Sequence, residues 1–246
     1  MLAATNIFRL AKKNAGGETL PPFPLKNKKQ INRKAIMTAQ ILNSIISSLA
    51  VTRQFYYSEA DFQHSLALAL SNVGCNVYLE YPIHNEHIDI ILEDKGQFYA
   101  IELKYRTIAL SYKGLLGTPG SLTNQDANDL GRYEFWKDVS RIEKLKSTVK
   151  ITEGYVVMLT NDDAYWKIPS GPSLKTIDRL FKIHSGMIVQ NVHWTNIPAK
   201  ASFNPHYKAG RTKYGGFPLS KPYIVPEWID YSNPSGCQFQ FMTIKV

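Results

Sequence analysis

Apolar and polar side chains alternate along two short runs between residues 87 and 105, and Lys95-Gly96 separates the runs. A period of two is typical of β-strands, because successive side chains point to opposite faces of a sheet. Lys95-Gly96 can form a two-residue hairpin loop, since glycine adopts a positive φ without steric cost. The pattern therefore predicts two antiparallel strands joined by a tight turn.

The register of this hairpin follows from the faces that it creates. With Asp94 opposite Gln97, Asp89 lies directly across from Glu102, and Lys104 shares their face. A shift of one residue would mix polar and apolar side chains on both faces. In the predicted register the opposite face is apolar throughout and carries Ile88, Ile90, Leu92, Ile101, Leu103 and Tyr105.

Two carboxylates directly across a strand pair repel each other. At about 5 Å and an effective dielectric constant near 20, the repulsion is roughly 3 kcal/mol. Lys104 supplies part of a counter-charge, and a divalent cation such as Mg²⁺ or Mn²⁺ would supply more, because hard cations bind carboxylate oxygens. Such a metal polarises a phosphoryl oxygen and lowers the pKa of bound water, and a nearby lysine assists.

Asp89, followed on the next strand by Glu102-Leu103-Lys104, resembles the Asp…Glu-x-Lys motif of the PD-(D/E)XK nuclease superfamily, which has the restriction-endonuclease-like fold. Ile88 stands where the strict motif has proline. The resemblance implies that Asp89, Glu102 and the carbonyl of Leu103 bind the metal and that Lys104 positions the attacking water. The alternative is a chance Glu-x-Lys pair on a solvated strand face.

The segments around the hairpin fit an α/β fold in which helices flank a mixed central sheet. Apolar residues recur with helical spacing over residues 35–50, 58–74 and 131–145. The continuous apolar run within residues 154–162 predicts a buried strand. The resemblance covers residues 55–162 as a restriction-endonuclease-like core. Residues 1–54 are then an N-terminal helical extension, and residues 163–246 are a C-terminal elaboration.

Glu59 lies at the start of the helix that Ser58 caps, on the edge of the apolar stripe of this helix. In the nuclease superfamily a glutamate at this place is a frequent extra contact to the metal or the water. The resemblance therefore adds Glu59 to the candidate catalytic residues. An acid that the helix dipole favours is the alternative.

The formal net charge of +9 favours an anionic partner, most simply nucleic acid, and the resemblance to restriction-type nucleases implies DNA. A glycine-rich segment places Tyr207, Lys208, Arg211 and Lys213 together, and such a mixture suits contact with phosphates and bases. An ordinary surface loop is the alternative. The long connection over residues 106–130 begins just beyond Lys104, and we expect a functional loop that wraps a substrate.

The chain has only two cysteines, Cys75 and Cys237, which lack the spacing of a zinc site or a disulfide framework. This usage predicts a reducing compartment, the cytoplasm. No apolar run suffices to span a membrane. Residues 1–17 predict a short surface or dimer-contact helix, which allows a homodimer. Because no acid precedes Glu18, a mitochondrial presequence is the alternative.

These features together predict a metal-dependent nuclease that hydrolyses phosphodiester bonds, most simply in DNA. The alternative is a non-catalytic nucleic-acid-binding module with the same fold. The complete set of Asp89, Glu102 and Lys104 favours the enzyme, because a binding module has no use for a pair of acids that repel each other.

Overall fold

The computed structural model describes residues 37–246 apart from 85, 115, 171–175 and 196–214. The segment 1–17 with its predicted helix therefore lies outside the described residues. The proposed nucleic-acid contacts Tyr207, Lys208, Arg211 and Lys213 also lie outside them.

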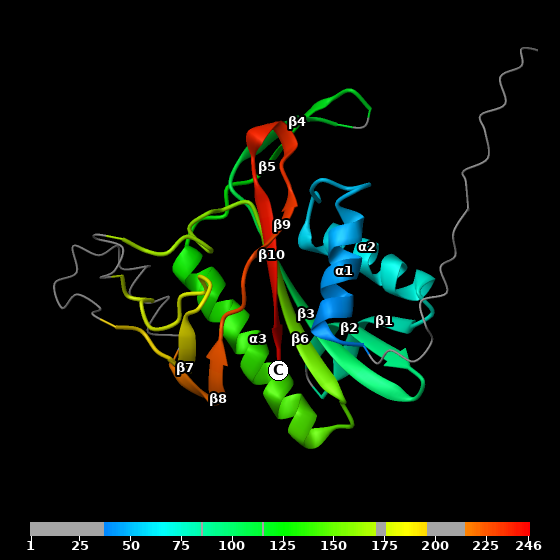
Figure 1. Ribbon diagram of the computed structural model, residues 1–246, viewed down its shortest axis with the longest axis vertical. Coiled ribbons are helices and arrows are strands. Elements are labelled where there is room, and N and C mark those ends of the chain that lie inside the picture. The colour runs from blue at the N-terminus through cyan, green and yellow to red at the C-terminus, as the bar shows by residue number, and fades with distance from the viewer. Residues whose placement is uncertain (1–36, 85, 115, 171–175, 196–214) are drawn as a thin grey trace, which may run out of the picture. The chain divides into compact units, whose positions relative to one another are not determined.

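A six-stranded mixed sheet forms the centre of the fold, in the order β1-β2-β3-β6-β10-β9 (Figure 1). Strands β1, β2 and β3 form an antiparallel meander, and β3 pairs with β6 in parallel. Strand β10 lies antiparallel to both β6 and β9. The strand bounds are β1 Asn76–Ile83, β2 Glu86–Asp94, β3 Gln97–Arg106, β6 Glu153–Thr160, β9 Ile229–Ser232 and β10 Phe239–Lys245.

Three α-helices in the described part of the chain cover the two faces of this sheet: α1 Ala39–Leu49, α2 Glu59–Asn72 and α3 Asn128–Thr148. Helices α1 and α2 lie on one face, and α3 lies on the other (Figure 1). Helix α2 begins where the sequence predicts, because the Ser58 hydroxyl accepts a hydrogen bond from the Asp61 N–H at 3.1 Å. None of the helices is long and apolar enough to cross a membrane, as far as the described residues go.

Each face of the sheet has its own hydrophobic core. On the α1–α2 face, Leu42 and Phe62 pack with Ile101 and Val157 of the sheet. On the α3 face, Trp136 packs with Met158 and with side chains of two further strands, β7 Ile188–Val192 and β8 Phe217–Ile224. The continuous apolar run of β6 is buried on both faces, as the sequence predicts for a strand beside a parallel neighbour.

The long connection over residues 106–130, predicted as a loop, has secondary structure of its own. It contains a hairpin of β4 Leu110–Lys113 and β5 Pro119–Leu122, which projects from the end of β3 (Figure 1). The first turn of α3 also falls within this range. Backbone pairing between the two short strands satisfies groups that a loop would leave to water.

Candidate active site

The predicted hairpin is present as the turn between β2 and β3. Lys95 and Gly96 have φ values of 53° and 76°, and positive values at both central positions define a type I′ turn. The register runs from Asp94 opposite Gln97 to Ile90 opposite Ile101, as the sequence predicts. The alternation of side chains therefore determined the register although lysine is not the usual first residue of such a turn.

The two strands separate beyond the Ile90–Ile101 pair, so the expectation of a continuous ladder past Asp89 is wrong. Beyond this point, backbone N–H groups of β3 donate to two side-chain carboxylates. Asp89 Oδ2 accepts from the Leu103 N–H at 2.7 Å, and Glu59 Oε2 accepts from the Tyr105 N–H at 2.7 Å. Hydrogen bonds to a charged acceptor are stronger than neutral ones, which offsets the lost pairing.

Gln63 on α2 holds β2 at the place where the strands separate. Its amide nitrogen donates to the Asp89 carbonyl at 2.7 Å and to Glu80 Oε1 at 2.6 Å. Glu80 lies opposite on β1 with a φ of 47°, which interrupts regular pairing there. Ile88 accordingly packs on the α3 face with Ile91, so its predicted place on the other face is wrong.

The polar face of the hairpin does not face solvent, because α3 covers it. Glu102 is only 1% exposed and forms an ion pair with Arg141 of α3. Arg141 also contacts Asp138 Oδ1 at 3.2 Å and Glu86 at 3.9 Å. The contact of Arg141 with Asp138 is the helical pair that their spacing predicts. Both residues also form ion pairs with side chains of β3.

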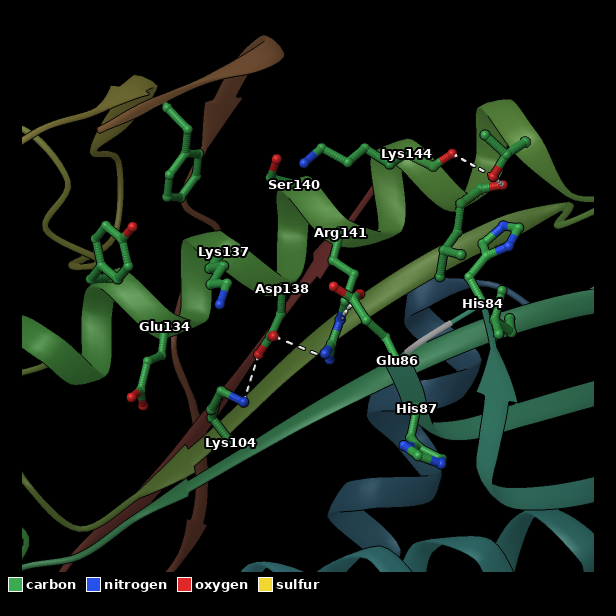
Figure 2. A pocket seen from close by; sticks show the side chains of 15 residues that line it. His84, Glu86, His87, Lys104, Glu134, Lys137, Asp138, Ser140, Arg141 and Lys144 are labelled. Atoms are coloured by element: carbon green, nitrogen blue, oxygen red, sulfur yellow. Dashed lines mark hydrogen bonds and ion pairs between the residues drawn. The ribbon is translucent and has the colours of Figure 1, made fainter. Parts of the chain in front are cut away.

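Lys104 points toward the same helix and contacts Asp138 Oδ2 at 2.6 Å (Figure 2). Its side chain is 16% exposed, so the expectation of a lysine on an open strand face is wrong. Burial lowers the pKa of Lys104, but Asp138 and Glu59 outweigh burial and raise it above its ordinary value. Lys104 therefore stays protonated at neutral pH.

The cluster holds more negative than positive formal charge. Four carboxylates interact here, those of Glu59, Asp89, Glu102 and Asp138, whereas Lys104 and Arg141 are the two cations that contact or act on them most closely. Fully ionised, this group of six side chains carries an excess of two negative charges. One divalent cation, or protons on the carboxylates, would neutralise that excess.

The pKa values of three of these acids rise for the same main reason. The pKa of Glu102 is raised to about 9, mainly by burial and also by Asp138 and Asp89, against the opposing effect of Arg141. Burial is also the largest cause of the raised pKa values of Asp89 and Glu59. The folded protein without metal therefore tends to hold protons here that an exposed acid would release.

Asp89, Glu102, Lys104 and Glu59, which the sequence singled out as candidates, lie together in the fold, whereas Asp138 and Arg141, which join them, were not predicted to do so. Asp138 lies four residues before Ile142, which is one helical turn along the buried stripe of α3. This helical spacing from a buried residue is the feature of the sequence that indicates that Asp138 faces the sheet.

The donor set is suited to a hard cation, although its present arrangement is not that of a metal site. Neither carboxylate oxygen of Glu102 has a hydrogen-bond partner in the described part of the chain, despite its contact with Arg141. Among the same residues no three His, Cys, Asp or Glu side chains are grouped as around a bound ion. Metal binding would therefore require local movement of side chains.

Comparisons with known proteins do not place this chain in a family. No protein-family profile, curated protein or solved structure matches it.

Proposed function

We propose that this protein is a metal-dependent nuclease with a restriction-endonuclease-like core, of the PD-(D/E)XK type. The observation that carries the proposal is the cluster at the point where β2 and β3 separate. Asp89, Glu102 and Lys104 meet there beside Glu59, with an excess of two negative charges. The net charge of +9 on the whole chain supports a nucleic acid, most simply DNA, as the substrate.

Asp89 and Glu102 are the residues that would hold Mg²⁺ or Mn²⁺, with the backbone of Leu103 beside them. The burial of Glu102 beside Asp89 and Asp138, with Arg141 as its directly contacting cation, supports this assignment, because a buried charge that is incompletely neutralised is costly. When bound, such a metal polarises a phosphoryl oxygen and makes water a better nucleophile at neutral pH. Glu59 would keep the end of β3 in place and add negative charge near the ion.

Lys104 would donate to the scissile phosphate or to the attacking water. Its contact with Asp138 keeps it protonated and orients its ammonium group. A positioned cation stabilises the charge that develops on the phosphoryl oxygens, and a site of low dielectric constant strengthens this effect. Asp138 acts through Lys104 and is a positioning residue.

The proposal is tested by incubating the purified protein with plasmid DNA and with RNA, with Mg²⁺, with Mn²⁺ and with EDTA. We expect cleavage of DNA that depends on the metal and is lost in Glu102→Gln. Retained folding of that variant, measured by its melting curve, excludes a trivial loss. Binding of nucleic acid without any cleavage would instead support the non-catalytic module.

A further inference from the structure

A groove opens directly beside the candidate site, between α3 and the turn that joins β1 to β2 (Figure 2). Its volume is about 730 Å³. Lys104, Asp138 and Arg141 form its inner wall, His84 and His87 lie on the β-strand side, and Phe217 of β8 adds an aromatic edge. The groove therefore leads from the protein surface to the ammonium group that we assign to catalysis.

The acids that line this groove all have cationic partners. Glu86 contacts Arg141, and Asp138 contacts both Lys104 and Arg141. The remaining acid, Glu134, forms an ion pair with Arg106.

Two lysines of the groove, Lys137 and Lys144, have no ion-pair partner among the described residues. Both residues are exposed. The groove is lined by four cations, Lys104, Lys137, Arg141 and Lys144, and by three acids, Glu86, Glu134 and Asp138, so its lining carries a net charge of +1. Lys137 and Lys144 are the exposed part of this positive charge. Fixed cations of this kind in a cleft attract an anionic ligand.

The positions of the two lysines follow the geometry of a helix. Lys137, Arg141 and Lys144 lie on successive turns of α3 along the groove (Figure 2). At about 1.5 Å per residue, the step from Lys137 to Lys144 spans about 10 Å along the helix axis. Long, flexible lysine side chains at this separation on one helix can reach different phosphates of the same strand.

We infer that this groove binds the sugar-phosphate backbone of a nucleic-acid strand, with Lys137 and Lys144 contacting phosphates that adjoin the scissile one. The inference rests on the proposed function only in treating one phosphate as the scissile one, since the groove and its charged residues are present whether or not the protein cleaves nucleic acid. Contacts to phosphates carry no sequence information, so the groove binds different sequences with similar affinity. Lys144 lies farther than Lys137 from Lys104 along α3 and marks the direction in which the strand leaves the site.

The test is the affinity of the full chain for short DNA oligonucleotides in EDTA, measured by fluorescence anisotropy over a range of salt concentrations. We expect Lys137→Ala with Lys144→Ala to weaken binding. We also expect the slope of log affinity against log salt to become shallower by about 2, close to one unit per phosphate contact. Single-stranded and duplex probes are compared, and the probe with the larger loss identifies the form that the groove holds.

Two further variants separate a local site from general charge. Lys95→Ala with Lys167→Ala removes two exposed lysines elsewhere and also reduces the net charge from +9 to +7. Lys137→Arg with Lys144→Arg keeps both charges in the groove. We expect both of these variants to bind with nearly the wild-type salt slope.

An unchanged slope in the Lys137/Lys144 alanine variant, or an equal loss in the Lys95/Lys167 control, would overturn the inference. Binding in EDTA does not depend on catalysis. If the groove binds as expected but Mg²⁺ supports no cleavage, the proposed nuclease activity fails and the binding site stands. If cleavage occurs but the groove variants bind normally, the activity stands and the assigned path of the strand fails.

Discussion

Arg141 of α3 forms an ion pair with Glu102 of β3, in which the Glu102 side chain is buried at 1% exposure whereas that of Arg141 keeps 25% exposure. A metal ion bound by Glu102 would therefore compete with this guanidinium for the carboxylate. Because Glu102 keeps a strongly raised pKa even beside Arg141, one cation does not satisfy the cluster. This relationship leads to predictions on pH, metal binding and the two basic residues of the site.

The stability of the metal-free protein should fall as the pH rises from about 4.5 to about 9. Glu102 has an ordinary pKa of 4.5 and a folded-state pKa of about 9, so the folded state holds a proton that the unfolded state releases in this window. The unfolding free energy therefore decreases with increasing pH. Melting temperatures in EDTA across this range measure the effect.

Glu102→Gln should flatten much of this pH dependence, because glutamine does not titrate. Saturating Mg²⁺ should also flatten it, since a metal replaces the proton and binds better at high pH. A melting temperature that is constant between these pH values in EDTA would show that folding does not raise the pKa of Glu102.

We expect millimolar Mg²⁺ to raise the melting temperature of the wild-type protein, and Asp89→Asn should remove most of this rise. A ligand that binds only the folded state stabilises it, and the variant lacks one charged donor. Without metal the variant should be no less stable, because the asparagine oxygen can still accept from the Leu103 N–H and one excess charge is gone.

The matched control for this substitution is Asp163→Asn, at an exposed residue that pairs with Lys167. It should keep the full response to Mg²⁺. A wild-type protein whose melting temperature ignores both Mg²⁺ and Mn²⁺ would count directly against a metal at Asp89.

Lys104→Ala should reduce single-turnover cleavage on the order of 10²-fold or more, as expected for loss of a transition-state donor. It should also lower the unfolding free energy by roughly 1–3 kcal/mol, since Asp138 loses a buried partner. The stability cost corrects the sequence-based expectation of an exposed lysine with little effect on the fold.

A double variant separates these two effects of Lys104. Lys104→Ala combined with Asp138→Asn should recover stability, because residue 138 then carries no charge that has lost the Lys104 partner, but it should not recover cleavage. Comparison of melting curves with single-turnover rates measures both. Cleavage at the wild-type rate by Lys104→Ala would make the Glu-Leu-Lys triplet a chance pattern.

Arg141→Ala should increase the affinity for Mg²⁺ by about tenfold, equivalent to about 1.4 kcal/mol, because the arginine no longer competes for Glu102. In EDTA the same variant should be less stable than wild type, since Glu102 and Asp138 lose a counter-charge. Titration calorimetry with Mg²⁺ measures the first effect.

Arg106→Ala provides the comparison for Arg141→Ala, because Arg106 pairs with the more exposed Glu134. Its affinity for Mg²⁺ should change much less. If Arg141→Ala abolishes metal binding instead, the arginine organises the site and does not compete with the metal.

The alternation of side chains over residues 87–105 determined the hairpin, its turn and its register from Asp94–Gln97 to Ile90–Ile101. The helix cap at Ser58 and the buried strand within residues 154–162 were predictable as well. All of these depend on local periodicity and on hydrogen bonds between residues close in the sequence, which a sequence pattern records directly.

Only the tertiary structure decided what lies over the polar face of the hairpin. The sequence pattern placed Glu102 and Lys104 on one face but could not show that α3 packs there with Asp138 and Arg141. It also placed Ile88 on the wrong face. The burial that shifts the pKa of Glu102 depends on how a helix sits on a sheet, and residues distant in the sequence set that packing.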